Sequence, residues 1–181
     1  MKKVKTTDYK VTSKDVFFLD TNIWLYLYAS IGKVNQNIVD EYSDLLSDIL
    51  DENAKLVTTS MQISEFINAY FRIEYNAELE RLGKKSNVFQ YKRDFRSSKT
   101  FQTLVSVIHK VISNKILKYT IKLDDDFSTL NIEEVLPANK EFDFNDEYFL
   151  YLCEKNKIKI VSHDKDIAKS NRDIELITSH R

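Results

Sequence analysis

Short runs rich in apolar residues alternate with longer amphipathic segments along this chain. The short runs have the apolar character of strands buried on both faces of a parallel sheet, and they lie at 16–19, 56–58, 159–161 and 174–177. The longer segments repeat apolar residues every three or four positions, as helices do, and they cover 22–29, 37–53, 59–82, 87–97, 99–121, 145–157 and 164–170. This alternation predicts a three-layer α/β/α fold with a short parallel central sheet.

Composition excludes several other classes of protein. The 181 residues include only two glycines, Gly32 and Gly83, and one proline, so a sandwich or barrel of many hairpins is not expected. The two glycines are too far apart in sequence to form a glycine-rich phosphate-binding loop. The single Cys153 excludes a disulfide framework and a multi-cysteine zinc site, and it favours a cytoplasmic location. The most apolar segment, 16–29, falls short of the ~20 residues of a membrane span, so no membrane association is expected.

Charge is segregated along the sequence, although the formal net charge is only −1. Residues 81–118 contain ten basic residues and one acid, whereas residues 124–147 contain nine acids and one lysine. Aromatic residues are interleaved with the basic ones, which is typical of nucleic-acid surfaces, because cations neutralise phosphates and rings stack on bases. We therefore expect an extra basic helical hairpin at about 84–122 to contact RNA. The candidate RNA contacts are Lys92, Arg93 and Arg96.

Four acidic residues are expected at one edge of the predicted sheet. Asp20 directly follows the first apolar run, and Asp164 follows the run at 159–161. Glu65 lies in the second turn of the helix after the second strand, and Asp146 lies in the first turn of the helix before the third. Ligand sites of open α/β sheets lie outside the carboxyl ends of the strands, so these side chains can converge. Bare carboxylates at close range repel one another and take up protons, and the cluster therefore implies Mg²⁺ or Mn²⁺.

The sequence around these acids falls into four recognisable segments. Residues 18–24 read Phe-Leu-Asp-Thr-Asn-Ile-Trp, 58–66 read Thr-Thr-Ser-Met-Gln-Ile-Ser-Glu-Phe, 144–149 read Phe-Asn-Asp-Glu-Tyr-Phe, and 160–167 read Ile-Val-Ser-His-Asp-Lys-Asp-Ile. Together they resemble the four motifs of the PIN-domain nuclease family, in the family's order. Ser162 stands where the family usually has threonine and keeps the hydroxyl, and Ile167 replaces the usual aromatic residue.

The resemblance implies a single PIN-like domain over 1–181, with 84–122 as an inserted helical hairpin. It implies a Mg²⁺- or Mn²⁺-dependent endoribonuclease in which Asp20, Asp146 and Asp164 hold the metal and Glu65 ligates it or orients a water. The residues expected to support them are Thr21, Asn22, Asp143, Ser162 and Asp166. Such nucleases are most often the toxins of toxin–antitoxin pairs, so RNA is the expected substrate, an antitoxin is a candidate partner, and a homodimer is expected.

The same acids also have plainer interpretations. Asp20 and Asn22 are residue types that cap helices, and Glu65 suits a solvated helix face. Asp164 suits the first turn of a helix, where the helix dipole favours negative charge. Asp143 remains an alternative to Asp146 as the third ligand.

Alternatives also remain for the whole chain. A PIN-like RNA-processing nuclease outside any toxin–antitoxin pair, and a non-catalytic RNA-binding protein, would both account for the basic segment. Trp24, Tyr26 and Tyr28 are candidates either for a dimer surface or for the hydrophobic core.

Overall fold

A parallel sheet organises the molecule. The structure is a computed structural model that describes residues 1–31, 35–124, 126–136 and 142–180, so Asp125 and Glu141 of the acidic segment lie outside the described residues. Within these ranges the sheet has six strands, all parallel, in the order β1-β6-β5-β2-β3-β4. The strands are β1 (Lys2–Lys5), β2 (Val16–Leu19), β3 (Lys55–Thr58), β4 (Thr120–Lys122), β5 (Lys159–Val161) and β6 (Glu175–Thr178).

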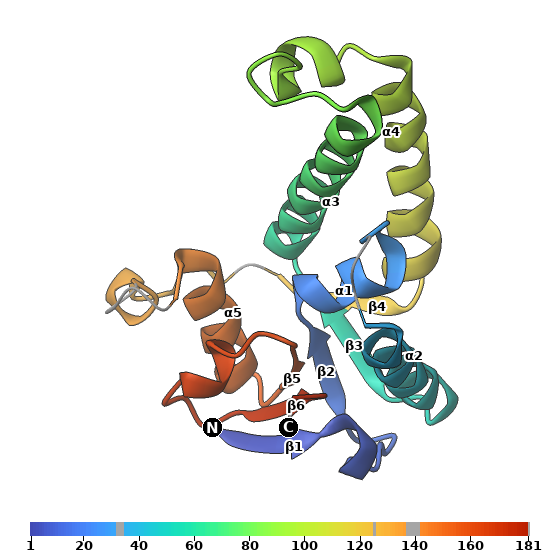
Figure 1. The fold of residues 1–181 in the computed structure, drawn as a ribbon. Helices are drawn as coiled ribbons and strands as arrows, with labels where there is room; N and C mark the ends of the chain where they lie inside the picture. Colours follow the sequence, from blue (N-terminus) through green and yellow to red (C-terminus); the bar gives the residue numbers. More distant parts are fainter. Residues whose placement is uncertain (32–34, 125, 137–141, 181) are drawn as a thin grey trace.

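Helices lie on both faces of this sheet, as the sequence predicted. In Figure 1, α2 and α5 lie on opposite sides of the strands. The α-helices of the described residues are α1 (Thr21–Tyr28), α2 (Gln36–Asp51), α3 (Ser60–Leu82), α4 (Lys99–Val111) and α5 (Phe144–Lys155). Among the described residues, no helix combines the length and the apolarity that crossing a membrane requires.

The central strand β2 divides the hydrophobic core into two clusters. Phe17 and Leu19 pack into the cluster formed with α1, α2 and α3, whereas Phe18 packs into the cluster formed with α5. Successive side chains of a strand point to opposite faces, so a short apolar run can support both clusters. Burying a side chain of this size contributes roughly 1.5–3 kcal/mol. The end of β2 is therefore held firmly, and the residue that follows it is well positioned.

Two strands at the edges of the sheet were not predicted. β1 contains three lysines and one valine, and it pairs with β6 at the edge, where solvent-facing lysines are tolerated and prevent unwanted pairing. β4 falls inside the helix predicted over 99–121, because α4 ends at Val111 and a π-helical turn over Ile112–Ile116 follows it. The short helix predicted over 164–170 is a 3₁₀ turn at Ile167–Lys169.

A long arm projects from the sheet. In Figure 1, α3 and α4 run side by side away from the strands, and Phe71 of α3 packs on Phe101 of α4 with ring centroids 4.6 Å apart. The prediction of a helix over 87–97 is wrong in length and type, because the connection contains only a π-helical turn at Tyr91–Phe95. The hairpin is therefore formed by α3 and α4, and residues 83–98 make up the arm tip.

Candidate active site

Sheet topology places the ends of two acidic motifs side by side. β2 and β5 are neighbours, with Leu19 opposite Val161, and the Asp20 amide extends the pairing by donating to the Val161 carbonyl at 2.9 Å. The chain leaves β2 towards β3 on one side and returns to β5 on the other. A reversal of this kind opens a crevice at the carboxyl ends of the strands, and Asp20 and Ser162 lie there.

The Asp20 carboxylate is held by side chains and does not cap a helix. It precedes α1, but it makes no side-chain capping hydrogen bond. Its Oδ2 accepts from the Ser162 hydroxyl at 2.6 Å and from the Asn22 amide at 2.7 Å. Asp20 is only 9% exposed. The structure thus brings Asp20, Asn22 and Ser162 together, and capping does not explain Asp20.

The segment after β5 adds Asp164 to this group, whereas the Asp166 carboxylate forms an ion pair elsewhere. The Ser162 hydroxyl accepts from the Asp164 amide at 3.0 Å, and the His163 amide donates to Asn22 Oδ1 at 3.3 Å. Asp164 is exposed. The Asp166 carboxylate pairs with Lys169 at 2.7 Å, so its charge is already matched by a neighbour.

Glu65 is positioned by the first turns of α3. The side chain of Thr59 accepts from the Gln62 amide at 3.1 Å, as expected for a helix cap. The buried Gln62 side chain then donates to the Leu19 carbonyl at 2.5 Å and accepts from the Thr58 hydroxyl. These bonds fasten α3 to the end of β2. Glu65 follows within one helical turn and is therefore directed towards the same sheet edge.

The start of α5 brings in the third motif. Asp143 is its N-cap, and with Asp146 it forms a capping box in which each carboxylate accepts from the other residue's amide. Asn145 donates to Glu65 Oε2 at 3.4 Å, which links α5 to α3. Asp143, expected as a supporting residue, thus caps α5. Asp146 faces the acidic residues of the other motifs, although it also belongs to the capping box.

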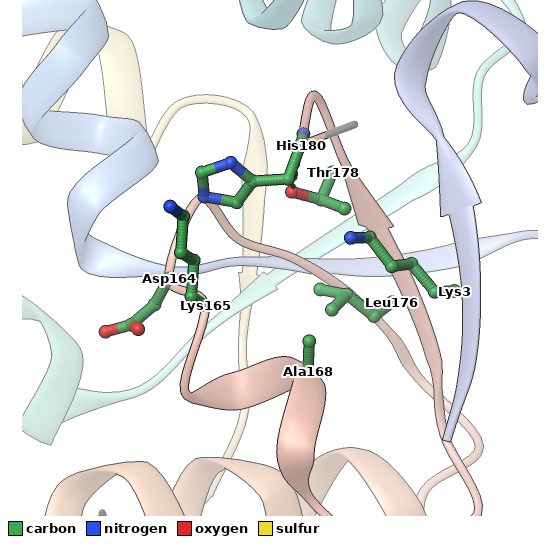
Figure 2. A pocket seen from close by; sticks show the side chains of 7 residues that line it. All are labelled: Lys3, Asp164, Lys165, Ala168, Leu176, Thr178 and His180. Carbon is green, nitrogen blue, oxygen red and sulfur yellow. Dashed lines mark hydrogen bonds between the residues drawn. The ribbon is translucent and has the colours of Figure 1, made fainter.

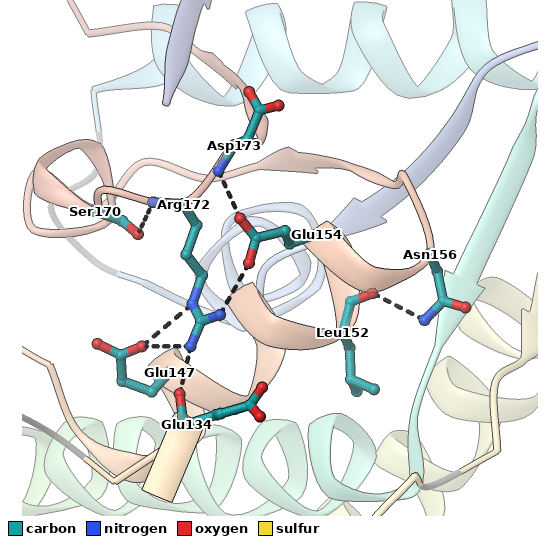
Figure 3. Close-up of polar contacts among 8 residues, drawn as sticks. All are labelled: Glu134, Glu147, Leu152, Glu154, Asn156, Ser170, Arg172 and Asp173. Carbon is teal, nitrogen blue, oxygen red and sulfur yellow. Dashed lines mark hydrogen bonds and ion pairs between the residues drawn. The ribbon is translucent and has the colours of Figure 1, made fainter. Parts of the chain in front are cut away.

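Arg172 holds α5 through ion pairs with two of its glutamates. One of them is Glu147, whose charge is therefore already matched. Its guanidinium pairs with Glu147 at 3.2 Å and Glu154 at 3.0 Å, and it donates to the Glu134 carbonyl at 2.6 Å. Figure 3 shows these contacts converging on one guanidinium. Because Glu147 is paired with Arg172, Asp143 and Asp146 are the acids of this motif that remain for the site.

The pKa values of three acids show that the four motifs act on one another. Burial raises the pKa of Asp20 to about 6, with Asp164 adding to the effect and Ser162 opposing it. Burial raises the pKa of Glu65 to about 7, reinforced by the charges of Asp20, Asp143 and Asp146. Burial also raises the pKa of Asp146 to about 6, with further contributions from Asp143, Asp20 and Asp164. Mutual repulsion of this kind is what a bound cation relieves.

The residues present have the chemistry of a site for a hard divalent cation. Mg²⁺ and Mn²⁺ prefer carboxylate oxygens, and Asp20, Glu65, Asp146 and Asp164 supply them. The buried Thr21 side chain lies beside Glu65 and lowers its pKa through a hydrogen bond, against the effect of burial. The arrangement is more open than a closed ligand shell, since within the described ranges no three His, Cys, Asp or Glu side chains form a group that could hold a metal ion.

Sequence reasoning missed a buried network beside this site. The Tyr42 hydroxyl lies 3.0 Å from His163 Nδ1 and accepts from the Ser179 amide at 3.0 Å. His180 Nε2 donates to the His163 carbonyl at 2.6 Å, and the two imidazole rings stack at 3.9 Å. The network holds the loop after β5, and so Asp164, against α2. The bonded pairs are 16 to 137 positions apart in sequence, and no local pattern connects them.

The candidate RNA contacts lie apart from the acidic group, at the arm tip. Arg93 pairs with Asp94 at 2.8 Å, Arg96 lies over the Phe101 ring at 5.7 Å, and Lys92 is exposed. The phenylalanines of this region pack against neighbouring aromatic rings. Phe95 is fully buried, so the tip is a small aromatic core with a basic surface.

The aromatic residues of α1 serve different roles. Trp24 is 1% exposed and belongs to the core, which excludes it from a dimer surface. Tyr26 and Tyr28 are half-buried. Tyr26 contacts the His163 ring edge-to-face at 5.5 Å, and Tyr28 stacks on Trp24.

Comparisons with known proteins add little to this geometry. No family model matches the sequence, and no curated protein matches it at a significant level. Among solved structures, the chain is similar to one described as "Crystal structure of PAE2754 from Pyrobaculum aerophilum", with 17% sequence identity over 90% of each chain and a TM-score of 0.44. We therefore base the function on the side chains at the sheet edge.

Proposed function

We propose that this chain is a divalent-metal-dependent endoribonuclease of the PIN type. The observation that carries the proposal is the group of four acids from four separate segments at one sheet edge, three of which have raised pKa values. Asp20, Asp146 and Asp164 would hold Mg²⁺ or Mn²⁺. A bound ion of this kind lowers the pKa of coordinated water and stabilises negative charge on a phosphoryl group.

The side chains of the chain itself have distinct tasks in this proposal. Ser162 and Asn22 both donate to Asp20 Oδ2, so they hold one carboxylate oxygen in a fixed place. Glu65, with a pKa of about 7, can take a proton from a water near neutral pH, as a general base must. Thr21, whose buried side chain lowers the pKa of Glu65 through a hydrogen bond, can orient the Glu65 carboxylate.

The basic arm tip supports RNA as the polyanion. Lys92 and Arg96 are exposed there, and the Arg96 guanidinium lies over the Phe101 ring. Exposed cations of this kind contact the backbone of a single strand. A toxin with an antitoxin partner is the biological setting that the resemblance favours, and an acidic antitoxin segment could occupy the same tip. The resemblance also favours a homodimer for this chain.

Cleavage of a labelled RNA by the wild type and by Asp20→Asn tests the proposal. We expect Mg²⁺- or Mn²⁺-dependent cleavage by the wild type and a loss of at least about a hundredfold in Asp20→Asn, on the scale of removing one catalytic electrostatic group. Asp44→Asn is the matched control, because Asp44 is an exposed aspartate of α2. The proposal fails if the wild type shows no metal-dependent cleavage, or if Asp20→Asn retains it.

A non-catalytic RNA-binding protein is the second candidate. The openness of the acidic group, in which no metal-holding set is formed among the described residues, favours it. This candidate predicts RNA binding that EDTA does not change and no cleavage with any divalent metal.

A further inference from the structure

A pocket of about 500 Å³ lies next to the acidic group, on the side of β6 and β1. This volume is in the range of sites for small ligands. Figure 2 shows side chains from β1, from residues 164–168 and from residues 176–180 around it. The residues that define its character are Lys3, Asp164, Lys165, Leu176, Thr178 and His180.

Two cations face this pocket without a carboxylate partner. Lys3 and Lys165 lie on opposite sides of it in Figure 2, and within the described part of the chain neither forms an ion pair. Nearby lysines differ, since Lys2 and Lys159 both pair with Glu175. A lysine kept unpaired at a concave surface is available to an anion.

The remaining walls suit a ribose or a base. Ala168 is exposed and supplies an apolar wall, whereas Leu176 is fully buried and lies behind the pocket surface. The His180 ring is fixed in the wall by its stacking on His163 and by its bond to the His163 carbonyl. A ligand with one anionic group and one flat or apolar part would match these surfaces.

Asp164 connects the pocket to the acidic group. Asp164 lines the pocket, but in Figure 2 its carboxylate points away from Leu176 and Lys3. Its amide donates to Ser162 Oγ, which donates to Asp20. A polyanion bound across Asp164 would therefore have one phosphate at the acids and an adjoining one at the lysines.

Distance decides which cations can assist at the acids. Glu65 and Leu82 are seventeen residues apart on α3, which is about 25 Å at 1.5 Å per residue. Charges separated by more than about 8–10 Å are largely screened at ordinary ionic strength. The arm tip therefore cannot offset the repulsion between the acids and a phosphate, whereas Lys165, next to Asp164 in sequence, can.

We propose that this pocket binds the nucleotide adjoining the cleaved phosphodiester, with Lys3 and Lys165 on its phosphate and Ala168 and His180 against its sugar or base. The inference rests on the proposed function, because it assigns an RNA subsite to that active site. It predicts that a single nucleotide binds here weakly even without metal.

The first experiment follows uridine 5′-monophosphate binding by amide NMR in EDTA. Shifts are expected at Lys3, Ala168 and Thr178, and Lys3→Gln/Lys165→Gln should weaken binding about tenfold, the scale of losing a charge-assisted contact. Lys5→Gln is the matched control, because Lys5 is an exposed lysine of β1 outside the pocket lining. Absence of shifts at these residues, or equal affinity in the double variant, overturns the inference.

The second experiment measures RNA cleavage kinetics with the same variants. The double variant should raise KM about tenfold and leave kcat nearly unchanged, since the lysines bind an adjoining phosphate and hold no metal. A free-nucleotide site unrelated to RNA would bind uridine 5′-monophosphate yet leave KM unchanged, which overturns the inference. If the wild type binds the nucleotide but cleaves no RNA with metal, the proposed function fails and the RNA subsite with it. In that case the NMR shifts still show that the pocket binds a nucleotide.

Discussion

The acidic sheet edge and the basic arm tip carry opposite charge, and the protein builds them in opposite ways. At the sheet edge, Asp20 is almost fully buried, bonded on one oxygen by two neighbours, and raised in pKa. At the arm tip, Lys92 and Arg93 are exposed. A catalytic group has to be held within fractions of an ångström, whereas phosphate contacts need only positive charge within reach. The comparison predicts that stability and cleavage, which depend on the sheet edge, change with pH and divalent metal. RNA binding by the arm tip should change with salt concentration.

The largest expected effect is on the pH dependence of stability without metal. Folding raises the pKa of Asp20 from 3.8 to about 6 and that of Glu65 from 4.5 to about 7. The folded protein therefore holds more protons than the unfolded chain between pH about 4 and 7, and the free energy of unfolding decreases as pH rises through this window. For the buried Asp20 the shift corresponds to about 3 kcal/mol, and the more exposed Glu65 contributes less than its shift suggests.

Urea unfolding in EDTA at pH 5, 6.5 and 8 measures this decrease. Asp20→Asn should remove about 1.4 kcal/mol of it, because only the last unit of the Asp20 shift lies above pH 5, while the control Asp44→Asn should follow the wild type. Mg²⁺ should stabilise the wild type most at pH 8, because it binds the ionised carboxylates. A wild type whose stability is constant from pH 5 to 8 would contradict the coupling of the four motifs.

A smaller effect is expected from the arm tip. Changing Lys92, Arg93 and Arg96 to alanine should weaken RNA binding roughly ten- to hundredfold at low salt, and should flatten the log–log salt slope by up to about 2, at about 0.7 for each phosphate. Arg93 is already paired with Asp94, so a flattening nearer to about 1.4 is expected. Cleavage at saturating RNA should persist, because the tip supplies affinity and no metal ligand.

Anisotropy titrations at several salt concentrations measure the slope. The charge-matched control changes Lys10, Lys14 and Lys55 to alanine, since these exposed lysines lie near the amino ends of the central strands. An unchanged slope in the arm variant would assign the tip to a protein partner such as an acidic antitoxin.

The sequence predicted the centre of the sheet better than its edges. Strands buried on both faces need continuous apolar residues, so the runs around Phe18 and Ile160 could be recognised. β1 could not, because an edge strand is stabilised by backbone pairing and tolerates lysines such as Lys2 and Lys3. β4 was hidden because the apolar spacing of α4 continues into the residues that follow it.

The acids of the site were predictable, but the residues that hold them were only partly so. Asp20 and Asp164 were recognisable because strand ends are fixed points in an α/β sheet. Gln62 had the local pattern of a capping box with Thr59, yet its side chain bonds Leu19, 43 positions away. Tyr42 contacts the residues after β5 from 120 positions away. Such contacts depend on the assembled layers, and no local sequence signal encodes them.

The smallest expected effect concerns Ser162. Its hydroxyl donates to Asp20 Oδ2 at 2.6 Å and lowers the pKa of that carboxyl against the effect of burial. Ser162→Ala should therefore raise the pKa of Asp20 further, by roughly one unit, or about 1 kcal/mol. Cleavage should decrease about threefold near pH 6.5, approach a tenfold loss only at lower pH, and hardly change near pH 8.5, so the acid limb of the pH–rate profile moves to higher pH. Ser162→Thr, which keeps the hydroxyl, should restore the wild-type profile. If Ser162→Ala reduces cleavage equally at every pH, the serine acts only by packing and by its bond to the Asp164 amide, and the tuning of Asp20 must come from Asn22 and the backbone alone.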